Sequence, residues 1–393
     1  MTTAEIQRLE DAFQLPTYKK MPIALVRGEG CRVWDADGNA YYDFYGGHCV
    51  ALLGHCPPRV VAAVQEQLGR LLFYSNVVYS PVRARAAALL AEMAPDGLGH
   101  AFFCNSGTEA NETALKLART WTGKTAVIAM EGDFHGRTLG SLATTWGEHY
   151  RAPYRAILPE TIFVPFGEAD AVARVLAERD DVAAIILEPI QSMAGIFEAP
   201  PAFYQVLRRL CDEHGVALIF DEVQTGVGRT GTFSIAEQYG ITPDLITLAK
   251  SLGAGVPVGA VLASDAIAAS VGYGDQGTTF GGGMLAMAAV TATLETLRDE
   301  RLMERATHIH ARIRDGLRPL VRDVRGRGCL IGVELDGPAA PVLASLRAEG
   351  ILAGGASHPR VIRLMPPLNT PDDAIDALIA AFQAVLASNP TTA

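Results

Sequence analysis

Short apolar runs alternate with longer amphipathic stretches from about residue 100 to residue 262. The stretch TEANETALKLARTW has the spacing of a helix with one apolar face, whereas VAAIILEP and VALIFDE are short and almost wholly apolar. Strands that lack a polar face are covered on both sides. The pattern therefore predicts an α/β fold with a mostly parallel central sheet between two layers of helices.

The two ends of the chain follow a different pattern. RVWDADGNAYYDF predicts a β-hairpin that turns at Asp37 and Gly38. A long helical stretch opens at Met284, mixed strands and helices follow, and a last helix runs from Pro371 to about Ala387. We expect these C-terminal elements to form a smaller α+β domain that the N-terminal hairpin joins. The predicted division is an N-terminal segment (1–52), a large domain (53–283) and a small domain (284–393).

Composition narrows the range of functions. The chain has 393 residues, of which 49% are hydrophobic, and a net charge of -10 from 33 basic and 43 acidic side chains. No block of lysine and arginine gathers, so nucleic acid is not an expected partner. The N-terminus does not have the pattern of a signal peptide, and no run of about 18 apolar residues suggests a membrane span. We expect a cytoplasmic protein, and the 6 scattered cysteines predict reduced thiols without a metal site.

One lysine stands out in the run DLITLAKSLGAGVPVGAVLASD. Between Asp244 and Asp265, Lys250 is the only ionisable side chain. An unpaired charge among apolar and small residues costs free energy, so Lys250 must be paired, neutralised or used chemically.

Small polar residues lie where the strand HAFFC meets the following helix. Ser106, Gly107 and Thr108 offer free backbone N–H groups and hydroxyls at a helix N-terminus, which suits an anion such as a phosphate. The alternative is a plain helix cap without a ligand.

Two further strand ends carry polar groups. Phe134 and His135 follow the strand TAVIAM, where the aromatic ring can stack on a planar ligand or simply belong to the core. Asp221 and Glu222 end the strand VALIFDE, at the edge of the sheet where ligands bind in open α/β folds. A carboxylate there can hold a buried cation or a metal, but no histidine cluster accompanies it.

A dinucleotide site is an alternative, because Gly226, Gly228 and Gly231 form a G-x-G-x-x-G pattern. That pattern should open directly into a helix, and here a glycine-rich loop with a delayed helix is expected. His308 and His310 alternate on a predicted helix, so they do not face one another as metal ligands would, and we expect them on a solvated helix surface.

The four strand ends supply a possible phosphate-binding site, an aromatic ring that could stack on a ligand, a buried carboxylic acid and a single lysine. Pyridoxal 5'-phosphate uses all four: its phosphate, its ring, its pyridine nitrogen and its aldehyde match them in that order.

These motifs resemble the class III aminotransferases, the fold-type I pyridoxal-phosphate enzymes that include the acetylornithine and ornithine types. The likeness covers nearly the whole chain and is carried by RVWDADGNAYYDF, FFCNSGTEANETALKLAR, FHGRT, EPIQ, FDEVQTGVGRTG, LAKSLGAGVPVGA, GTTFGG and VIRLMPPLN. The closest likeness is to the acetylornithine type.

The resemblance implies roles for the residues around the cofactor. Lys250 would bind the aldehyde and then move the substrate's proton, and Asp221 would keep the pyridine nitrogen protonated. Gln224 would hydrogen-bond the phenolic oxygen, and Val223 would pack on the ring face opposite Phe134. The phosphate would lie on Ser106, Gly107 and Thr108, and Thr279 would reach the phosphate of a partner subunit. The resemblance thus implies a homodimer with shared sites.

The resemblance also implies a substrate site. Arg363 would bind an α-carboxylate, and Tyr18 would contact the substrate. Arg137 would bind the second carboxylate of glutamate or, as in acetylornithine-type enzymes, the substrate carboxylate. Two arginine forks suit 2-oxoglutarate as acceptor. The chain departs from the family at EPIQSMAG, where Met193 replaces a glutamate that usually covers the α-carboxylate arginine. Gln276 also stands where a histidine is common.

The sequence thus predicts an aminotransferase that moves the terminal amino group of N-acetylornithine, or of a related N-acylated diamine or ω-amino acid, to 2-oxoglutarate. The alternatives are an ω-amine:pyruvate aminotransferase, or an epimerase or aminomutase of the same fold. A non-catalytic ligand-sensing module and a dehydrogenase are the alternatives from other classes.

Overall fold

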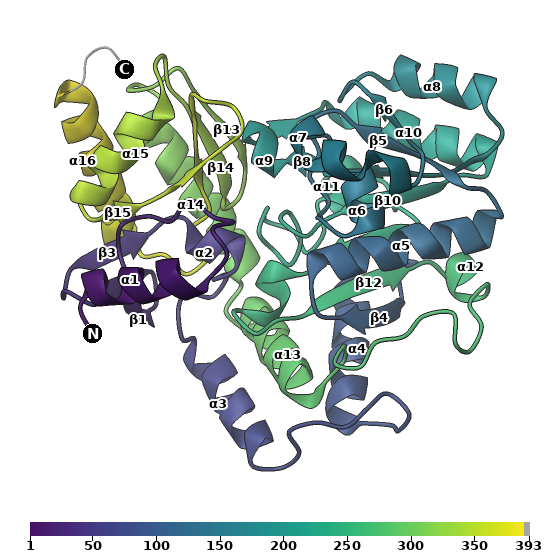
Figure 1. Cartoon of the computed structure of the whole chain (residues 1–393), viewed down its shortest axis with the longest axis horizontal. Helices are drawn as coiled ribbons and strands as arrows, with labels where there is room; N and C mark the ends of the chain where they lie inside the picture. Colours follow the sequence, from purple (N-terminus) through teal and green to yellow (C-terminus); the bar gives the residue numbers. More distant parts are fainter. Residues whose placement is uncertain (389–393) are drawn as a thin grey trace.

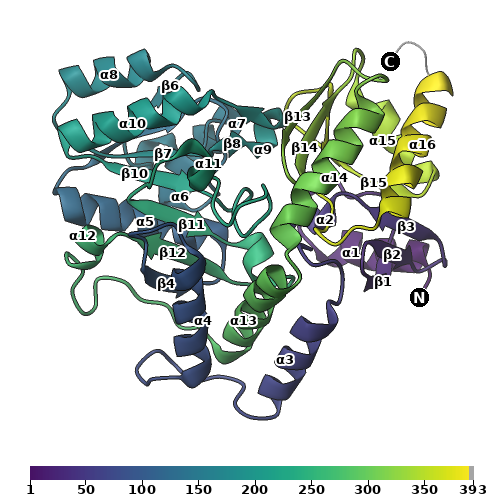
Figure 2. The same cartoon turned by 180° about the vertical axis from the view of Figure 1, so that it is seen from behind.

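The computed structural model describes residues 1–388. Its centre is a seven-stranded sheet (Figures 1 and 2). In spatial order the strands are β4 (His100–Cys104), β12 (Gly259–Ala263), β11 (Leu245–Leu248), β10 (Ala217–Asp221), β7 (Val182–Leu187), β5 (Ala126–Met130) and β6 (Thr161–Val164).

Six of these strands run in one direction. β10 pairs in parallel with β11 and β7, and β5 with β7 and β6, whereas β12 is antiparallel to both of its neighbours, β11 and β4. The largely parallel sheet expected from the apolar runs is confirmed, with β12 as the reversed strand. Because β4, β5, β10 and β11 share a direction, the residues that follow them meet at one edge of the sheet.

Helices bury both faces of the sheet. Alternate residues of β5 divide between two apolar clusters, with Val127 and Ala129 on one face and Ile128 and Met130 on the other. The first face packs against helix α5 (Gly107–Thr122), which lies across β12, β11, β10 and β7 (Figure 1). The second face packs against α10 (Pro201–His214), whose Phe203, Tyr204 and Leu207 belong to the same core as Phe220. Burial on both sides explains why these strands carry no polar face.

The remaining elements of the large part surround this core. They are α3 (Pro58–Leu68), α4 (Pro81–Met93), α6 (Leu139–Ala143), α7 (Glu148–Arg151), η1 (Ala152–Ile157), α8 (Ala169–Glu178), β8 (Ile190–Gln191), α9 (Ser192–Gly195), β9 (Phe197–Glu198), α11 (Ala236–Tyr239), η2 (Lys250–Gly253) and α12 (Asp265–Ala268).

The C-terminal part contains a four-stranded sheet and four helices. The strands, in spatial order, are β13 (Asp323–Arg327), β14 (Leu330–Glu334), β17 (Val361–Leu364) and β16 (Gly354–Gly355). The helices are α13 (Met284–Asp299), α14 (Leu302–Leu317), α15 (Ala339–Ala348) and α16 (Asp372–Ser388). The last helix begins one residue after Pro371, close to the predicted start.

The N-terminal elements are α1 (Thr3–Phe13), β1 (Leu25–Glu29), β2 (Arg32–Asp35), β3 (Ala40–Asp43) and the short α2 (Gly46–Cys49). The predicted hairpin is confirmed, since β2 and β3 pair around Asp37 and Gly38, and Gly38 has a φ of +91°. β3 pairs in parallel with β15 (Ile351–Leu352) of the C-terminal part, and Figures 1 and 2 show the N-terminal elements beside the C-terminal part. The N-terminal hairpin therefore joins the C-terminal part, as expected, and the division at residues 52 and 283 stays our proposal.

Candidate active site

A cavity of about 400 Å³ lies at the edge of the central sheet where β4, β5, β10 and β11 end. This volume is in the range of sites for small ligands. The structure brings eight of the predicted residues to its wall, namely Ser106, Gly107, Thr108, Phe134, His135, Asp221, Val223 and Lys250.

The N-terminus of α5 forms one wall of the cavity. Ser106 caps this helix, because its hydroxyl accepts the backbone N–H of Glu109 at 3.3 Å. A Cβ on Gly107 would lie 2.9 Å from the side chain of Val223, so a larger residue would not fit without a shift. The result is a close-packed helix start with backbone N–H groups facing the cavity, as an anion site requires.

Asp221 ends β10 and is buried, with 4% of its surface exposed. Its Oδ2 accepts hydrogen bonds from Asn111 Nδ2 and His135 Nδ1, each at 2.7 Å, and its Oδ1 accepts the N–H of Val223 at 3.1 Å. Asn111 is held in turn by Thr247 Oγ1, which donates to its amide oxygen at 2.8 Å. Three donors therefore fix the carboxylate in a buried position where an unpaired charge would be costly.

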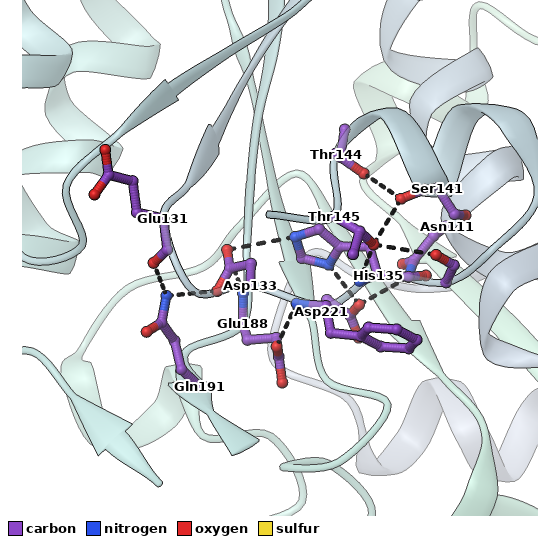
Figure 3. A network of polar contacts seen from close by, with 12 residues as sticks. Asn111, Glu131, Asp133, His135, Ser141, Thr144, Thr145, Glu188, Gln191 and Asp221 are labelled. Carbon is purple, nitrogen blue, oxygen red and sulfur yellow. Dashed lines mark hydrogen bonds and ion pairs between the residues drawn. The ribbon is translucent and has the colours of Figure 1, made fainter. Parts of the chain in front are cut away.

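His135 lies between two carboxylates (Figure 3). Its Nδ1 bonds Asp221, and its Nε2 is 3.4 Å from Asp133 Oδ2, an ion-pair distance. Burial opposes the positive charge most strongly, but Asp133 and Asp221 outweigh it and raise the pKa of His135 to about 10. The imidazole is therefore a buried cation near neutral pH.

Asp133 and Glu188 extend this network away from the cavity (Figure 3). Asp133 accepts Gln191 Nε2 at 2.9 Å, and Glu188 accepts the N–H groups of Phe134 at 2.8 Å and Ser192 at 3.1 Å. Burial, together with the charges of Asp133 and Asp221, raises the pKa of Glu188 to about 8. The network thus links the loop that carries Phe134 to the segment that follows Glu188.

Lys250 follows β11 and begins η2 with a φ of +41°. A residue with a side chain pays a conformational cost there of about 1–3 kcal/mol, which is typical of residues constrained by function. Burial lowers the pKa of Lys250, and the carboxylates Asp221 and Glu188 act in the opposite direction. A lowered pKa increases the fraction of neutral amine, which is the nucleophilic form.

Gln224 is buried beside the cavity, and its side-chain oxygen has no hydrogen-bond partner within residues 1–388. Phe134 is half-buried, and its ring meets Tyr150 edge-on at 5.8 Å between centroids. An aromatic wall, an aliphatic wall at Val223 and an unpaired buried amide together suit a planar ligand with polar substituents.

Arg363 lies on β17, with 2% of its surface exposed. Its Nε donates to Gly355 O at 2.6 Å and its Nη1 to Ser192 Oγ at 3.2 Å, and no carboxylate of the described chain forms an ion pair with it. Burial lowers its pKa. A buried guanidinium without a carboxylate is suited to bind an anionic ligand.

Besides Gln224 and Arg363, four further predicted residues do not line the cavity in the single chain. Arg137 is exposed and stacks on Tyr150, with its guanidinium carbon 4.6 Å from the ring centre. Tyr18 is 78% exposed. Met193 is half-buried next to Ser192, and its carbonyl accepts the N–H of Ser357 at 2.8 Å. Thr279 is exposed and lines a different hollow with Asn105 and Glu109.

Sequence reasoning missed Asn111, Asp133 and Glu188. The first is one polar position on the buried face of an amphipathic helix, and the third is part of the EPIQ motif, to which no role was given. Asp133 precedes His135 by two residues, so the spacing in EGDFHG was the available signal.

The dinucleotide alternative was wrong. Gly228 and Gly231 have φ values of +82° and +100°, and no helix begins until α11 at Ala236. Glu222 does not reach the cavity, because its carboxylate accepts Ile235 N at 3.0 Å and Thr225 Oγ1 at 3.2 Å and so holds the glycine loop.

His310 corrects another expectation. It was predicted to lie on a solvated helix surface, but it is half-buried and its Nδ1 is 3.1 Å from Gly328 O. Across residues 1–388, no group of three or more His, Cys, Asp or Glu side chains is arranged to hold a metal ion. No helix in the same range is long and apolar enough to cross a membrane.

Comparison with known proteins identifies the family. A family model described as aminotransferase class-III matches residues 13–386. This chain belongs to the class-III aminotransferases.

Individual relatives agree with that result. The chain is 46% identical over 380 residues to the acetylornithine aminotransferase of Methanopyrus kandleri. This alignment covers 96% of this chain and 97% of the relative. Its structure matches an ornithine aminotransferase of Toxoplasma gondii, with partial occupancy of PLP at the active site, at a TM-score of 0.92 and 33% identity over 98% and 95% of the two chains. It also matches an (S)-enantioselective omega-transaminase of Thermomicrobium roseum at a TM-score of 0.91 and 30% identity over 99% of each chain.

This class-III aminotransferase has the fold-type I architecture and depends on pyridoxal 5'-phosphate. The cavity residues fit that cofactor, because the tight Gly107 turn leaves backbone N–H groups for a phosphate and the buried carboxylate of Asp221 matches a protonated ring nitrogen. The unpaired oxygen of Gln224 adds a polar contact.

The charge of His135 predicts how the stability of the cofactor-free aminotransferase depends on pH. The folded pKa of about 10 exceeds the unfolded value of 6.5, so the stabilisation is complete below pH 6.5 and is lost as the pH rises toward 10. Glu188 acts in the same direction up to about pH 8. Above about pH 9 the buried thiols of Cys104, Cys211 and Cys329, whose pKa values burial raises from 9.0, act in the same direction too. In the window from pH 8 to 10 the contribution of His135 is therefore obtained by comparing wild type with a variant at this position.

We expect the free energy of unfolding to fall in this window by up to about 1.4 kcal/mol per pH unit, the slope for one proton. Denaturant midpoints measured for wild type and His135→Gln should show a flatter profile in the variant. His100→Gln, at an exposed histidine, is the control. Equal slopes in wild type and His135→Gln would contradict the assignment.

Proposed function

We propose that this aminotransferase transfers the terminal amino group of N-acetylornithine, or of a related N-acylated diamine, to 2-oxoglutarate, giving a semialdehyde and glutamate. The observation that carries the proposal is Arg363, a buried guanidinium without a carboxylate partner within residues 1–388. It lies close enough to Lys250 for its charge to contribute to the lowered pKa of that lysine. The curated relatives at 39–46% identity are acetylornithine aminotransferases, which supports this donor.

We assign the cofactor contacts as follows. Ser106, Gly107 and Thr108 bind the phosphate, Phe134 and Val223 enclose the ring, Asp221 pairs with the ring nitrogen, and Gln224 bonds the phenolic oxygen. When bound, the cofactor withdraws electrons from the carbon that bears the substrate amine. His135 keeps Asp221 oriented, because its Nδ1 bonds Asp221 Oδ2 while its Nε2 is held at Asp133.

Lys250 supplies the base at the reacting carbon. Its lowered pKa keeps part of the amine neutral, so its Nζ can accept the substrate proton and return it at the neighbouring position. Arg363 orients the substrate by its carboxylate, and Arg137 offers a second carboxylate site from the exposed loop that follows β5. Tyr18, which is exposed in the single chain, remains a proposed substrate contact.

The substrate assignment is tested by a panel of donors and acceptors. We expect N-acetylornithine with 2-oxoglutarate to form glutamate at a specificity constant at least tenfold above that with pyruvate. Coupled glutamate detection and the visible absorbance of the cofactor provide the readouts. A preference for pyruvate with simple ω-amines would instead support the omega-transaminase alternative. The structural likeness to the omega-transaminase of Thermomicrobium roseum is the reason for testing it.

Replacing Lys250 tests its role directly. We expect Lys250→Ala to retain cofactor through the phosphate site but to lose transamination by several orders of magnitude, because the nucleophile and the base are both removed. Borohydride treatment followed by peptide mass mapping should label residue 250 in wild type and not in the variant. Lys124→Ala, at a half-buried lysine outside the cavity that is bonded to His214 O, should behave as wild type. Turnover at the wild-type rate by Lys250→Ala would refute the assignment.

Met193 tests how the carboxylate site is controlled. A glutamate beside Ser192 would lie near Arg363 and pair with it while the amino donor is bound. We expect Met193→Glu to raise the preference for amino donor over glutamate by about tenfold, an effect of about 1.4 kcal/mol. Met193→Gln has a similar shape without the charge and should leave the ratio of specificity constants unchanged. No change with the glutamate would show that this position does not act on Arg363.

We further propose a homodimer with shared sites. The segment 71–80 exposes large apolar side chains, including Val77 and Tyr79, and Phe73 packs against Phe280 at 5.2 Å between ring centroids. Such a patch is typical of an interface between subunits, and it adjoins Thr279, which would then reach the partner's phosphate. Sedimentation velocity at micromolar concentration should show a dimer, and Thr279→Ala should weaken cofactor binding. A fully active monomer would contradict this proposal.

A further inference from the structure

The segment that follows β3 is strained beside the cavity. His48 and Cys49 have φ values of +69° and +68°, in the left-handed region. Each non-glycine residue in this conformation costs about 1–3 kcal/mol, and such strain persists where the surroundings hold it. The strain therefore raises the question of what this segment is held in place to do.

One end of the segment is tied to Lys250. The carbonyl of Cys49 accepts the hydroxyl of Ser251, the next residue along the chain from Lys250, at 3.0 Å. Val50 lines the same cavity as Lys250. His48 and Cys49 are therefore held against the start of η2.

The other end is tied to Arg363. The ring of Tyr45 packs directly on Gly354, where a Cβ would overlap it. Gly354 is the register partner of Arg363 in the pairing of β16 with β17, and the next residue, Gly355, accepts Arg363 Nε. The segment thus spans the space between the base and the carboxylate-binding guanidinium.

Tyr45 and His48 form a hydrogen-bonded pair between these two ends. The Tyr45 hydroxyl bonds His48 Nδ1, and the rings meet edge-on with centroids 5.3 Å apart. Burial raises the pKa of Tyr45, so the hydroxyl keeps its proton. Within residues 1–388 the hydroxyl has no other acceptor, so it donates to Nδ1 and the imidazole carries its proton on Nε2.

The imidazole is neutral and has one free donor. Burial and the nearby charges of Arg363 and Lys250 lower the pKa of His48 to about 4. Its Nε2 has no hydrogen-bond partner in the described chain and is not sealed from solvent. A neutral N–H between two cations offers a hydrogen bond to an anion without adding a third buried charge.

We propose that His48 is a specificity-determining residue whose Nε2–H, oriented by Tyr45, donates to the substrate carboxylate that Arg363 binds. The proposal rests on the proposed function, in which Arg363 holds a carboxylate. It names the substrate class as amines and oxo acids that carry a carboxylate at that end, in preference to simple monoamines.

The test uses the holoenzyme and glutarate, a dicarboxylate that lacks a reactive oxo group. Because a hydrogen bond to a charged group is among the stronger ones, we expect His48→Phe to raise the dissociation constant of glutarate at least tenfold by calorimetry. The KM for 2-oxoglutarate, whose carboxylate beside the oxo group is the one that Arg363 binds, should rise similarly. The KM for N-acetylputrescine, which lacks the carboxylate, should change by less than about threefold.

Conservative variants separate the contact from a structural effect. His48→Gln keeps an N–H donor and should recover most of the glutarate affinity, whereas Tyr45→Phe should weaken it because the imidazole loses its orientation. His100→Phe, at an exposed histidine, is the matched control. If His48→Phe fails to fold or to bind cofactor, judged by circular dichroism and visible absorbance, Tyr45→Phe and His48→Gln decide the question.

Unchanged glutarate affinity in these variants, or equal weakening of 2-oxoglutarate and N-acetylputrescine, would overturn the role of His48. A wild-type enzyme that forms no glutamate from 2-oxoglutarate would instead overturn the proposed function, and glutarate binding would still report on His48.

Discussion

The buried carboxylate of Asp221 is the constraint around which the site is organised. A charge with 4% of its surface exposed is stable only when donors surround it. Those donors come from α5, from the loop after β5 and from the backbone beyond β10, so three elements must meet at one point. The parallel direction of β4, β5, β10 and β11 makes this possible, because their ends share an edge.

The balance of charge across the cavity follows from that arrangement. Asp221 and Asp133 keep His135 cationic on one side, while Lys250 and Arg363 lie on the other side without a carboxylate in direct contact. Burial lowers the pKa values of both Lys250 and Arg363. A substrate that brings its own carboxylate supplies the anion that the second side lacks, which accords with an aminotransferase of amino acids.

Neutral groups surround Arg363 on this second side. Ser192 Oγ accepts a hydrogen bond from Arg363 Nη1. The Tyr45–His48 pair lies nearby, since the Tyr45 ring packs on Gly354, the register partner of Arg363. Met193, where the resemblance to the family predicts a glutamate, brings no charge. The carboxylate site is thereby left open to a ligand, since no internal carboxylate competes for it.

The sequence by itself determined the main layers and the local chemistry. Local patterns predicted the apolar strands, the Asp37–Gly38 turn and the amphipathic α5, because each of these depends on neighbouring residues. The same patterns predicted the helix start at Ser106 and the lysine after β11. The tertiary structure alone decided which polar groups meet. Asn111 and His135 lie 110 and 86 residues before Asp221. Tyr45 packs on Gly354, which pairs with Arg363 across two strands. The tertiary structure also decided that β12 runs antiparallel to its neighbours and that the Glu222 carboxylate bonds the glycine-rich loop. Contacts between distant segments depend on packing that no local pattern records.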